Sequence, residues 1–156
     1  MKILVAVNET KGSKNAVAKF VDMFSVCRAE SIVLLYVEKF DASFVMDEML
    51  GESEIKALME AVQGTEYKEM LDKKAQTILN YYKKLLEDNG MTGVKTLAKM
   101  GHPAEEILAA VEAEGVDMIV IGSRGKRFEP LLMGSVSREV LQKAEIPVLV
   151  IKGEKF

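Results

Sequence analysis

The sequence contains, at residues 118–125, the stretch Met-Ile-Val-Ile-Gly-Ser-Arg-Gly. Its first four residues are apolar, and a short apolar run that ends in glycine is typical of a strand covered on both faces of a sheet. Gly122 and Gly125 let the backbone turn sharply where that run ends. The stretch therefore predicts a buried strand that leads into a tight loop.

Similar apolar runs occur elsewhere in the chain, and segments of helical periodicity separate them. The runs lie at residues 3–7, 32–37, 94–98 and 148–151. Apolar residues spaced three and four apart predict helices within residues 17–24, 70–86, 107–111 and 136–144. This alternation predicts one α/β domain over residues 1–156, an open five-stranded parallel sheet with helices on both faces.

Composition and charge are those of an ordinary globular protein. Hydrophobic residues make up 49% of the chain and charged residues 29%, and a formal net charge of −3 argues against a nucleic-acid partner. The single cysteine, Cys27, cannot form a disulfide within the chain, and with the single histidine it cannot assemble a zinc site. No apolar run is long enough to cross a membrane, and residues 1–7 are too few for a secretory signal. We therefore expect a cytoplasmic protein without a membrane partner.

Residues directly after the apolar runs are candidates for ligand binding, because open α/β sheets bind ligands beyond the carboxyl ends of their strands. Beyond Gly125, the segment Gly134-Ser135-Val136-Ser137 opens a helix. Free N–H groups at such a helix terminus suit phosphate oxygens, and Arg124 adds positive charge nearby. The alternative interpretation is that the glycines only permit turns and that Ser135 or Ser137 caps the helix. The P-loop pattern and the G-x-G-x-x-G fingerprint after the first strand are both absent.

In its ordered set of motifs the chain resembles the universal stress protein family. The resemblance covers residues 5–8, 34–37, 101–107, 117–125 and 146–151. The family carries G-x-x-G, a nine-residue spacer, and then glycine with serine or threonine. Here eight residues separate Gly125 from Gly134. The resemblance implies the strand order 3-2-1-4-5 in a Rossmann-like fold of the adenine nucleotide alpha hydrolase-like kind.

The resemblance to the ATP-binding branch of this family implies an adenylate site. The residues of that site are assigned by their positions in the matching motifs of this sequence. Asn8, Thr10 and Val37 would line the base and ribose, and Gly101 and Ile121 would form the floor. The phosphates would lie against Gly122, Arg124, Gly125, Gly134, Ser135, Val136 and Ser137. The ligand implied is ATP, or AMP or ADP, with Mg²⁺ held by the phosphates. Two departures stand against this site: Asn8 replaces the family's usual aspartate, and the shorter spacer contains Pro130.

Three functions remain open from the sequence. The first is a stress-response or regulatory protein that binds ATP or a related adenylate. The second is a dimeric interaction module of the same family without nucleotide, which the short spacer and Asn8 keep open. The third is a slow ATPase, which would need a base and a metal clamp that the predicted crevice does not offer, so no catalytic or metal-binding residue is assigned.

A homodimer through residues 148–151 is expected for two reasons. The last strand of the order 3-2-1-4-5 lies at the edge of the sheet, where it would expose unpaired backbone groups. Pairing with a second copy across a two-fold axis would cover them, and the family resemblance implies the same interface.

The segment 38–64 interrupts the alternation of strands and helices. It holds seven acidic residues and two lysines, a net charge of −5. It is either a mobile lid or a solvated loop with a helical turn at residues 54–62. Because its charge would repel a polyphosphate, we expect it to be mobile or turned away from the crevice.

Overall fold

The computed structural model describes residues 1–25, 29–39, 51–123 and 133–152, except for the side chains of Glu52 and Ile55. Its strands are β1 (Lys2–Val7), β2 (Ser31–Lys39), β3 (Val94–Gly101), β4 (Met118–Gly122) and β5 (Val148–Ile151). They form one parallel sheet in the order β3-β2-β1-β4-β5. The fold class and the strand order expected from the sequence are confirmed.

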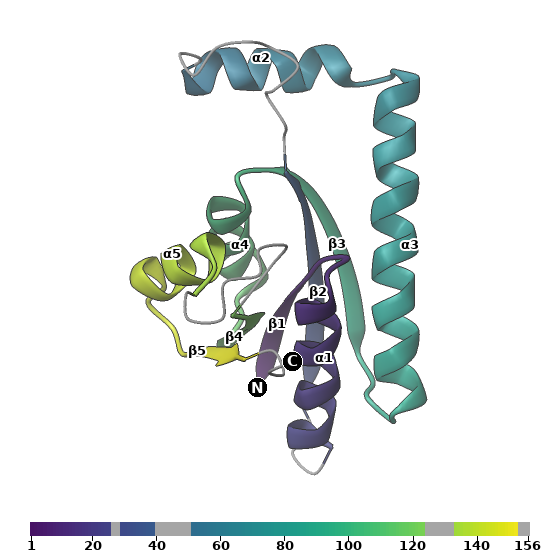
Figure 1. Ribbon diagram of the computed structural model, residues 1–156, viewed down its shortest axis with the longest axis vertical. Helices are drawn as coiled ribbons and strands as arrows, with labels where there is room; N and C mark the ends of the chain where they lie inside the picture. The colour runs from purple at the N-terminus through teal and green to yellow at the C-terminus, as the bar shows by residue number, and fades with distance from the viewer. Residues whose placement is uncertain (26–28, 40–50, 124–132, 153–156) are drawn as a thin grey trace.

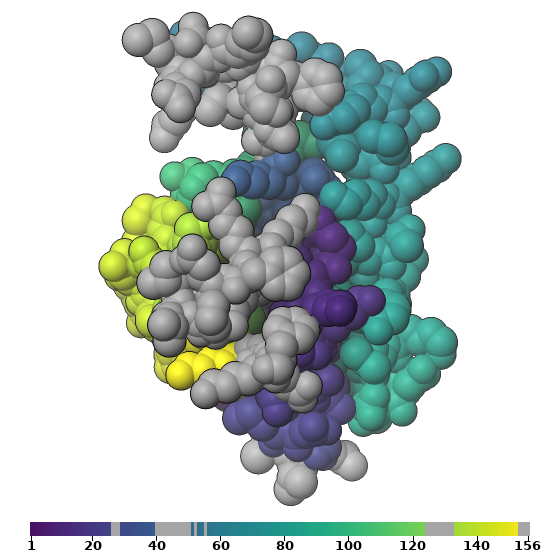
Figure 2. Space-filling model, in the orientation of Figure 1, coloured from purple at the N-terminus to yellow at the C-terminus, as the bar shows by residue number. Residues whose placement is uncertain are grey.

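Helices cover both faces of this sheet (Figure 1). They are α1 (Lys11–Phe24), α2 (Glu52–Val62), α3 (Glu66–Asp88), α4 (Pro103–Glu114) and α5 (Ser135–Lys143). The space-filling view places α3 and α5 on opposite sides of the molecule, with α1 between them (Figure 2).

The sheet separates two hydrophobic layers, because successive side chains of a strand point to opposite faces. Ile3, Val5 and Val7 of β1 pack in one layer with α1 and α3, where Phe20 and Leu79 are fully buried. Leu4 and Ala6 pack in the other layer with α4 and α5. Strands buried on both faces explain the continuous apolar runs of the sequence.

Local signals explain where the helices begin and end. Thr10 caps α1, since its hydroxyl accepts a hydrogen bond from Ser13 N. Pro103 occupies the first turn of α4, and Gly115 ends that helix in the left-handed conformation with φ 60°. Two residues of the predicted apolar stripes, Met70 and Leu141, are instead 58% and 48% exposed.

The acidic segment contains a complete helix where the sequence indicated a single turn. Helix α2 has 11 residues, and none whose side chain is described is buried. It crosses the molecule at the amino-terminal end of α3, away from the sheet (Figure 1). Residues 40–50 of the segment lie outside the described residues, so its mobility stays a prediction.

No helix in the described part of the chain is both long and apolar enough to cross a membrane.

Shortening Leu79 to alanine should be costly because the side chain is fully buried between α3 and the sheet. We expect Leu79→Ala to lower the free energy of unfolding by about 2–5 kcal/mol in urea denaturation. Met70→Ala on the same helix is the control, and it should change that free energy by less than about 0.5 kcal/mol. Equal effects of the two substitutions would contradict this packing of α3.

Candidate functional site

The order of the strands creates a crevice at the carboxyl ends of β1 and β4. These two strands pair in parallel with Ala6 beside Ile121, and Asn8 and Ser123 each follow two residues after this pair. The chain leaves β1 into α1 on one face of the sheet, and it leaves β4 toward α5 on the other face. Such a switch point is where open α/β sheets bind ligands.

Asn8 organises the turn between β1 and α1. Its Oδ1 accepts hydrogen bonds from Thr10 N at 2.9 Å and from Thr10 Oγ1 at 2.5 Å. Its backbone N–H donates to Ser13 Oγ at 2.9 Å. The turn is therefore fixed by bonds within residues 8–13, and Asn8 and Thr10 are both held in place at the crevice.

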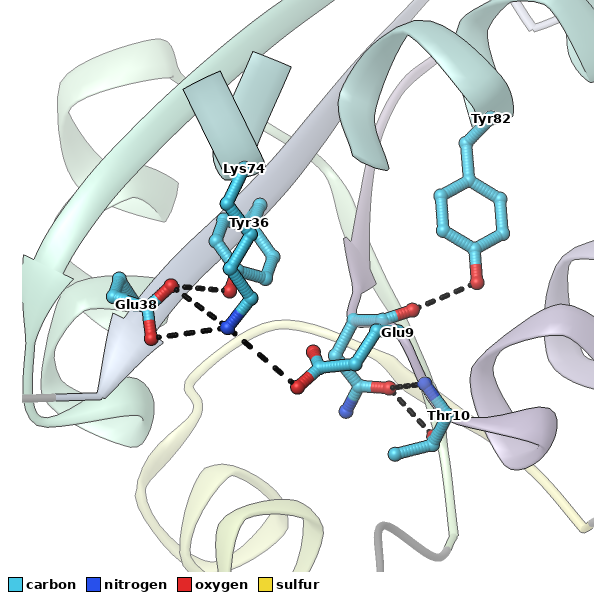
Figure 3. A network of polar contacts seen from close by, with 7 residues as sticks. Glu9, Thr10, Tyr36, Glu38, Lys74 and Tyr82 are labelled. Carbon is cyan, nitrogen blue, oxygen red and sulfur yellow. Dashed lines mark hydrogen bonds and ion pairs between the residues drawn. The ribbon is translucent and has the colours of Figure 1, made fainter. Parts of the chain in front are cut away.

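Helix α3 supports this turn from behind. The hydroxyl of Tyr82 donates to the Asn8 carbonyl oxygen at 2.8 Å, as the dashed line from Tyr82 shows (Figure 3). The Tyr82 side chain is 1% exposed, and burial raises the pKa of its hydroxyl. Because the Tyr82 hydroxyl stays protonated, it can donate the hydrogen bond that the Asn8 carbonyl oxygen accepts.

A second polar group joins α3 to the end of β2. Lys74 lies between the carboxylates of Glu38, at 3.2 Å, and Glu9, at 3.8 Å (Figure 3). The Tyr36 hydroxyl donates to Glu38 Oε2 at 2.5 Å, and burial, followed by this carboxylate, raises the pKa of Tyr36. The two acids nearest the turn are thus paired with a cation.

The first turn of α5 lies at the end of β4. Gly134 is the N-cap, no side chain in the described part of the chain caps the helix, and the first backbone bond runs from Arg138 N to Gly134 O at 3.0 Å. The N–H groups of Ser135, Val136 and Ser137 therefore have no acceptor within the helix. Gly134 N donates to Ser123 O at 2.7 Å, which joins this terminus to the strand.

Ser123 carries a buried hydroxyl without a partner. The residue is 7% exposed, and its Oγ has no hydrogen-bond partner in the structure that residues 1–25, 29–39, 51–123 and 133–152 define. A buried polar atom left unpaired costs free energy unless a ligand or water satisfies it. Ser123 directly follows β4 and stands in the sequence between Gly122 and Arg124.

Gly122 also has a packing role that the sequence did not indicate. A Cβ there would meet Gly12 O at 3.3 Å and the Ala16 side chain at 3.5 Å, both on α1. The absence of a side chain at Gly122 therefore lets α1 lie close to β4. This contact is on the face of the sheet opposite α5. Ile121, the expected floor residue, is buried in the layer with α4 and α5.

The other expected site residues lie at different distances from the switch point. Val37 is half-buried near the end of β2, and Gly101 ends the edge strand β3, on the far side of β2 from β1. Ser135 is exposed and Val136 half-buried, whereas Ser137 is 2% exposed and its hydroxyl lies 3.0 Å from Gly134 O and 3.3 Å from Ser123 O. Arg124 and Gly125 lie outside the described residues.

Sequence reasoning did not assign Ser123, Tyr82 or Lys74 to the site. Ser123 follows a buried strand, which is a usable signal. Tyr82 belongs to the apolar stripe of α3 and Lys74 to its polar side, so nothing in the pattern separates them from core and surface residues. Among the described residues no three His, Cys, Asp or Glu side chains gather where they could hold a metal ion.

Removing the Tyr82 hydroxyl should destabilise the protein, because the Asn8 carbonyl would lose its donor. We expect Tyr82→Phe to lower the free energy of unfolding by about 0.5–1.5 kcal/mol in chemical denaturation. Tyr81→Phe, which changes a neighbouring tyrosine that is 51% exposed, should leave that free energy unchanged. A loss of stability from Tyr81→Phe alone would contradict this support of the turn.

Comparisons with known proteins agree with the sheet described above. The model of the universal stress protein family matches residues 1–152. Universal stress protein MJ0577 of Methanocaldococcus jannaschii is 36% identical over 138 residues, which are 86% of this chain and 84% of that protein. The solved structure of MJ0577 has a TM-score of 0.77 at 35% identity, covering 99% of this chain and 97% of the other.

Two more distant structures share the fold and contain nucleotides. An Arabidopsis thaliana family protein, At3g01520, was solved with AMP bound and has a TM-score of 0.66 at 22% identity, covering 99% of this chain and 92% of the other. A universal stress protein in complex with cAMP has a TM-score of 0.63 at 15% identity, covering 99% and 98%. With the family model and MJ0577 in agreement, this chain belongs to the universal stress protein family.

Proposed function

We propose that this protein binds an adenylate at the β1–β4 crevice and acts through the bound nucleotide as a stress-response or regulatory protein. The ligand class is ATP, AMP or ADP, with any Mg²⁺ held by the phosphates. A cytoplasmic location remains a prediction from the sequence.

The observation that carries this proposal is that, among the described residues, the Ser123 hydroxyl has no partner and no side chain caps the nearby end of α5. A 5′-phosphate placed there would accept from Ser123 Oγ and from free N–H groups of the first turn. The helix dipole adds favourable interaction with the negative charge. A buried hydroxyl and three amides without an acceptor in the described part of the chain are a set of donors that an anion satisfies and that an apolar ligand does not.

The remaining parts of an adenylate fit the neighbouring strand ends. Neighbouring strands lie about 4.8 Å apart, which is close to the distance from a 5′-phosphate to its ribose. A phosphate at the end of β4 thus places the ribose over Asn8 and Thr10 at the end of β1. The base then lies beside Val37 at the end of β2, as the family resemblance implies.

The two nucleotide-bound relatives support the ligand class. One holds AMP and the other cAMP, so both ligands contain adenosine and a phosphate. These proteins share the fold with this chain, and the Ser123 environment supplies the independent physical argument.

The nucleotide-free interaction module is the second candidate, since Asn8 and the eight-residue spacer depart from the family's pattern. Slow ATP hydrolysis is less well supported. An ATPase needs a general base, and Glu9 and Glu38, the carboxylates closest to the turn, are both engaged in ion pairs with Lys74.

We propose a homodimer because of where β5 lies in the sheet. This strand of four residues lies at the edge of the sheet. Ile119 N bonds to Pro147 O and Ser123 N bonds to Ile151 O, so the backbone groups of Val148 and Val150 point away from β4. These outward groups are available to an antiparallel copy across a two-fold axis.

Nucleotide binding should depend on the Ser123 hydroxyl. We expect calorimetric titration of nucleotide-stripped protein with ATP, AMP and pyrophosphate, with magnesium present, to show saturable binding. Ser123→Ala should weaken binding by the value of one hydrogen bond, about 0.5–1.5 kcal/mol or roughly 2-fold to 13-fold. The same variant should be as stable as the wild type or more stable, because it removes an unpaired buried hydroxyl.

These opposite effects distinguish a ligand contact from a structural role. Ser25→Ala, which removes an exposed hydroxyl that bonds to Asp22 O at the end of α1, is the matched control and should alter neither measurement. Absence of saturable heat at millimolar ATP in folded protein would refute adenylate binding and favour the nucleotide-free module.

Dimerisation should require the outward N–H of Val150. We expect the wild type to sediment as a dimer at micromolar concentration and Val150→Pro to sediment as a folded monomer, because proline removes that donor and leaves the bonds toward β4. A wild type that is monomeric at this concentration would rule out the edge-strand dimer.

A further inference from the structure

Asn8 offers a ligand a donor and no acceptor. Both hydrogen bonds to its Oδ1 come from Thr10, one from the backbone N–H and one from the hydroxyl. A carbonyl oxygen has two lone pairs, so its acceptor capacity is used. The identity of this atom follows from chemistry: the backbone N–H of Thr10 can only donate, and the atom that it meets must be the oxygen.

The amide nitrogen of Asn8 is the polar atom that remains. The backbone N–H and C=O of this residue bond to Ser13 and Tyr82, and Nδ2 has no hydrogen-bond partner among the described residues. Nδ2 lies on the opposite side of the side-chain carbonyl carbon from Oδ1, so its protons point away from Thr10. Asn8 is half-buried, which leaves it accessible to a ligand.

The face on which this donor lies follows from the alternation along β1. Leu4 and Ala6 pack in the layer of α4 and α5, and Asn8 continues this series by two residues. Ile119 and Ile121 of β4 pack in the same layer, and Ser123 continues that series. Asn8 and Ser123 thus each follow, by two residues, a strand residue that faces α4 and α5, Ala6 on β1 and Ile121 on β4.

We propose that Asn8 selects nucleotides whose ribose carries a phosphoester on its 2′ or 3′ oxygen. This inference rests on the adenylate function proposed above, which places the ribose over the end of β1. A free ribose hydroxyl can accept from Nδ2, but its own proton finds no acceptor at Asn8. A phosphoester oxygen carries no proton and only accepts hydrogen bonds. It can therefore accept from Asn8 Nδ2 without leaving a donor of its own unpaired.

Electrostatics support the same ligand class. A carboxylate at position 8 would turn an anionic acceptor toward the ribose, which favours hydroxyls and repels phosphate. Asparagine removes that charge. The nearby carboxylates of Glu9 and Glu38 lie 3.8 Å and 3.2 Å from the Lys74 ammonium, which offsets one of their two negative charges.

The test compares 5′-AMP with adenosine 3′,5′-bisphosphate in calorimetric titrations of the nucleotide-stripped full chain. We expect the wild type to bind the bisphosphate more tightly, by about tenfold for one additional charge-assisted hydrogen bond. Asn8→Asp should reverse the order, with bisphosphate binding weakened by at least about tenfold and AMP binding kept or tightened. Aspartate can still accept both bonds from Thr10, so circular dichroism should show an unchanged fold.

Asn89→Asp is the matched control, because it adds the same charge at the exposed carboxyl-terminal end of α3. It should leave the ratio of the two affinities unchanged. Tighter binding of AMP than of the bisphosphate by the wild type would overturn this inference while leaving adenylate binding intact, and so would an Asn8→Asp ratio equal to that of the wild type. Failure of both nucleotides to bind would overturn the adenylate function as well.

Discussion

The parallel pairing of β1 with both β2 and β4 is the constraint on which the rest of this molecule depends. It puts the first strand in the middle of the sheet, so its side chains must be apolar in both directions. It also brings the turn after β1 beside the loop after β4, although more than a hundred residues separate them in the chain. Helix α1 approaches closely at Gly122, where a Cβ would meet Gly12 O at 3.3 Å and require a shift of a few tenths of an ångström.

Polar groups at the crevice are divided between those that hold the turn and those that remain available. Thr10, Ser13 and Tyr82 satisfy three of the four polar atoms of Asn8, and Lys74 joins α3 to the acids at the ends of β1 and β2. Among the described residues, the groups that remain include the Asn8 amide, the Ser123 hydroxyl and the amides of the first turn of α5. Such a surface is suited to the acceptors of a phosphorylated ligand, and preorganised donors bind it without a further ordering cost.

The sequence predicts the fold well because its apolar runs and helical stripes agree with each other along the whole chain. The position of the crevice also follows from sequence, since polar residues after buried strands meet at one edge of a parallel sheet. The unpartnered state of Ser123 could not be predicted, because it depends on which groups from distant segments surround it. Tyr82 illustrates the same limit, since its place in a stripe indicates burial but not that its hydroxyl reaches Asn8. Gly122 was expected at the ligand, and only the tertiary contact with α1 reveals its packing role.

The most direct test of the central claim is a crystal structure of the protein with 5′-AMP. The account predicts the 5′-phosphate within hydrogen-bonding distance of Ser123 Oγ and the first-turn amides of α5, with the ribose over Asn8. A nucleotide bound at another place, with Ser123 Oγ still without a partner, would contradict it.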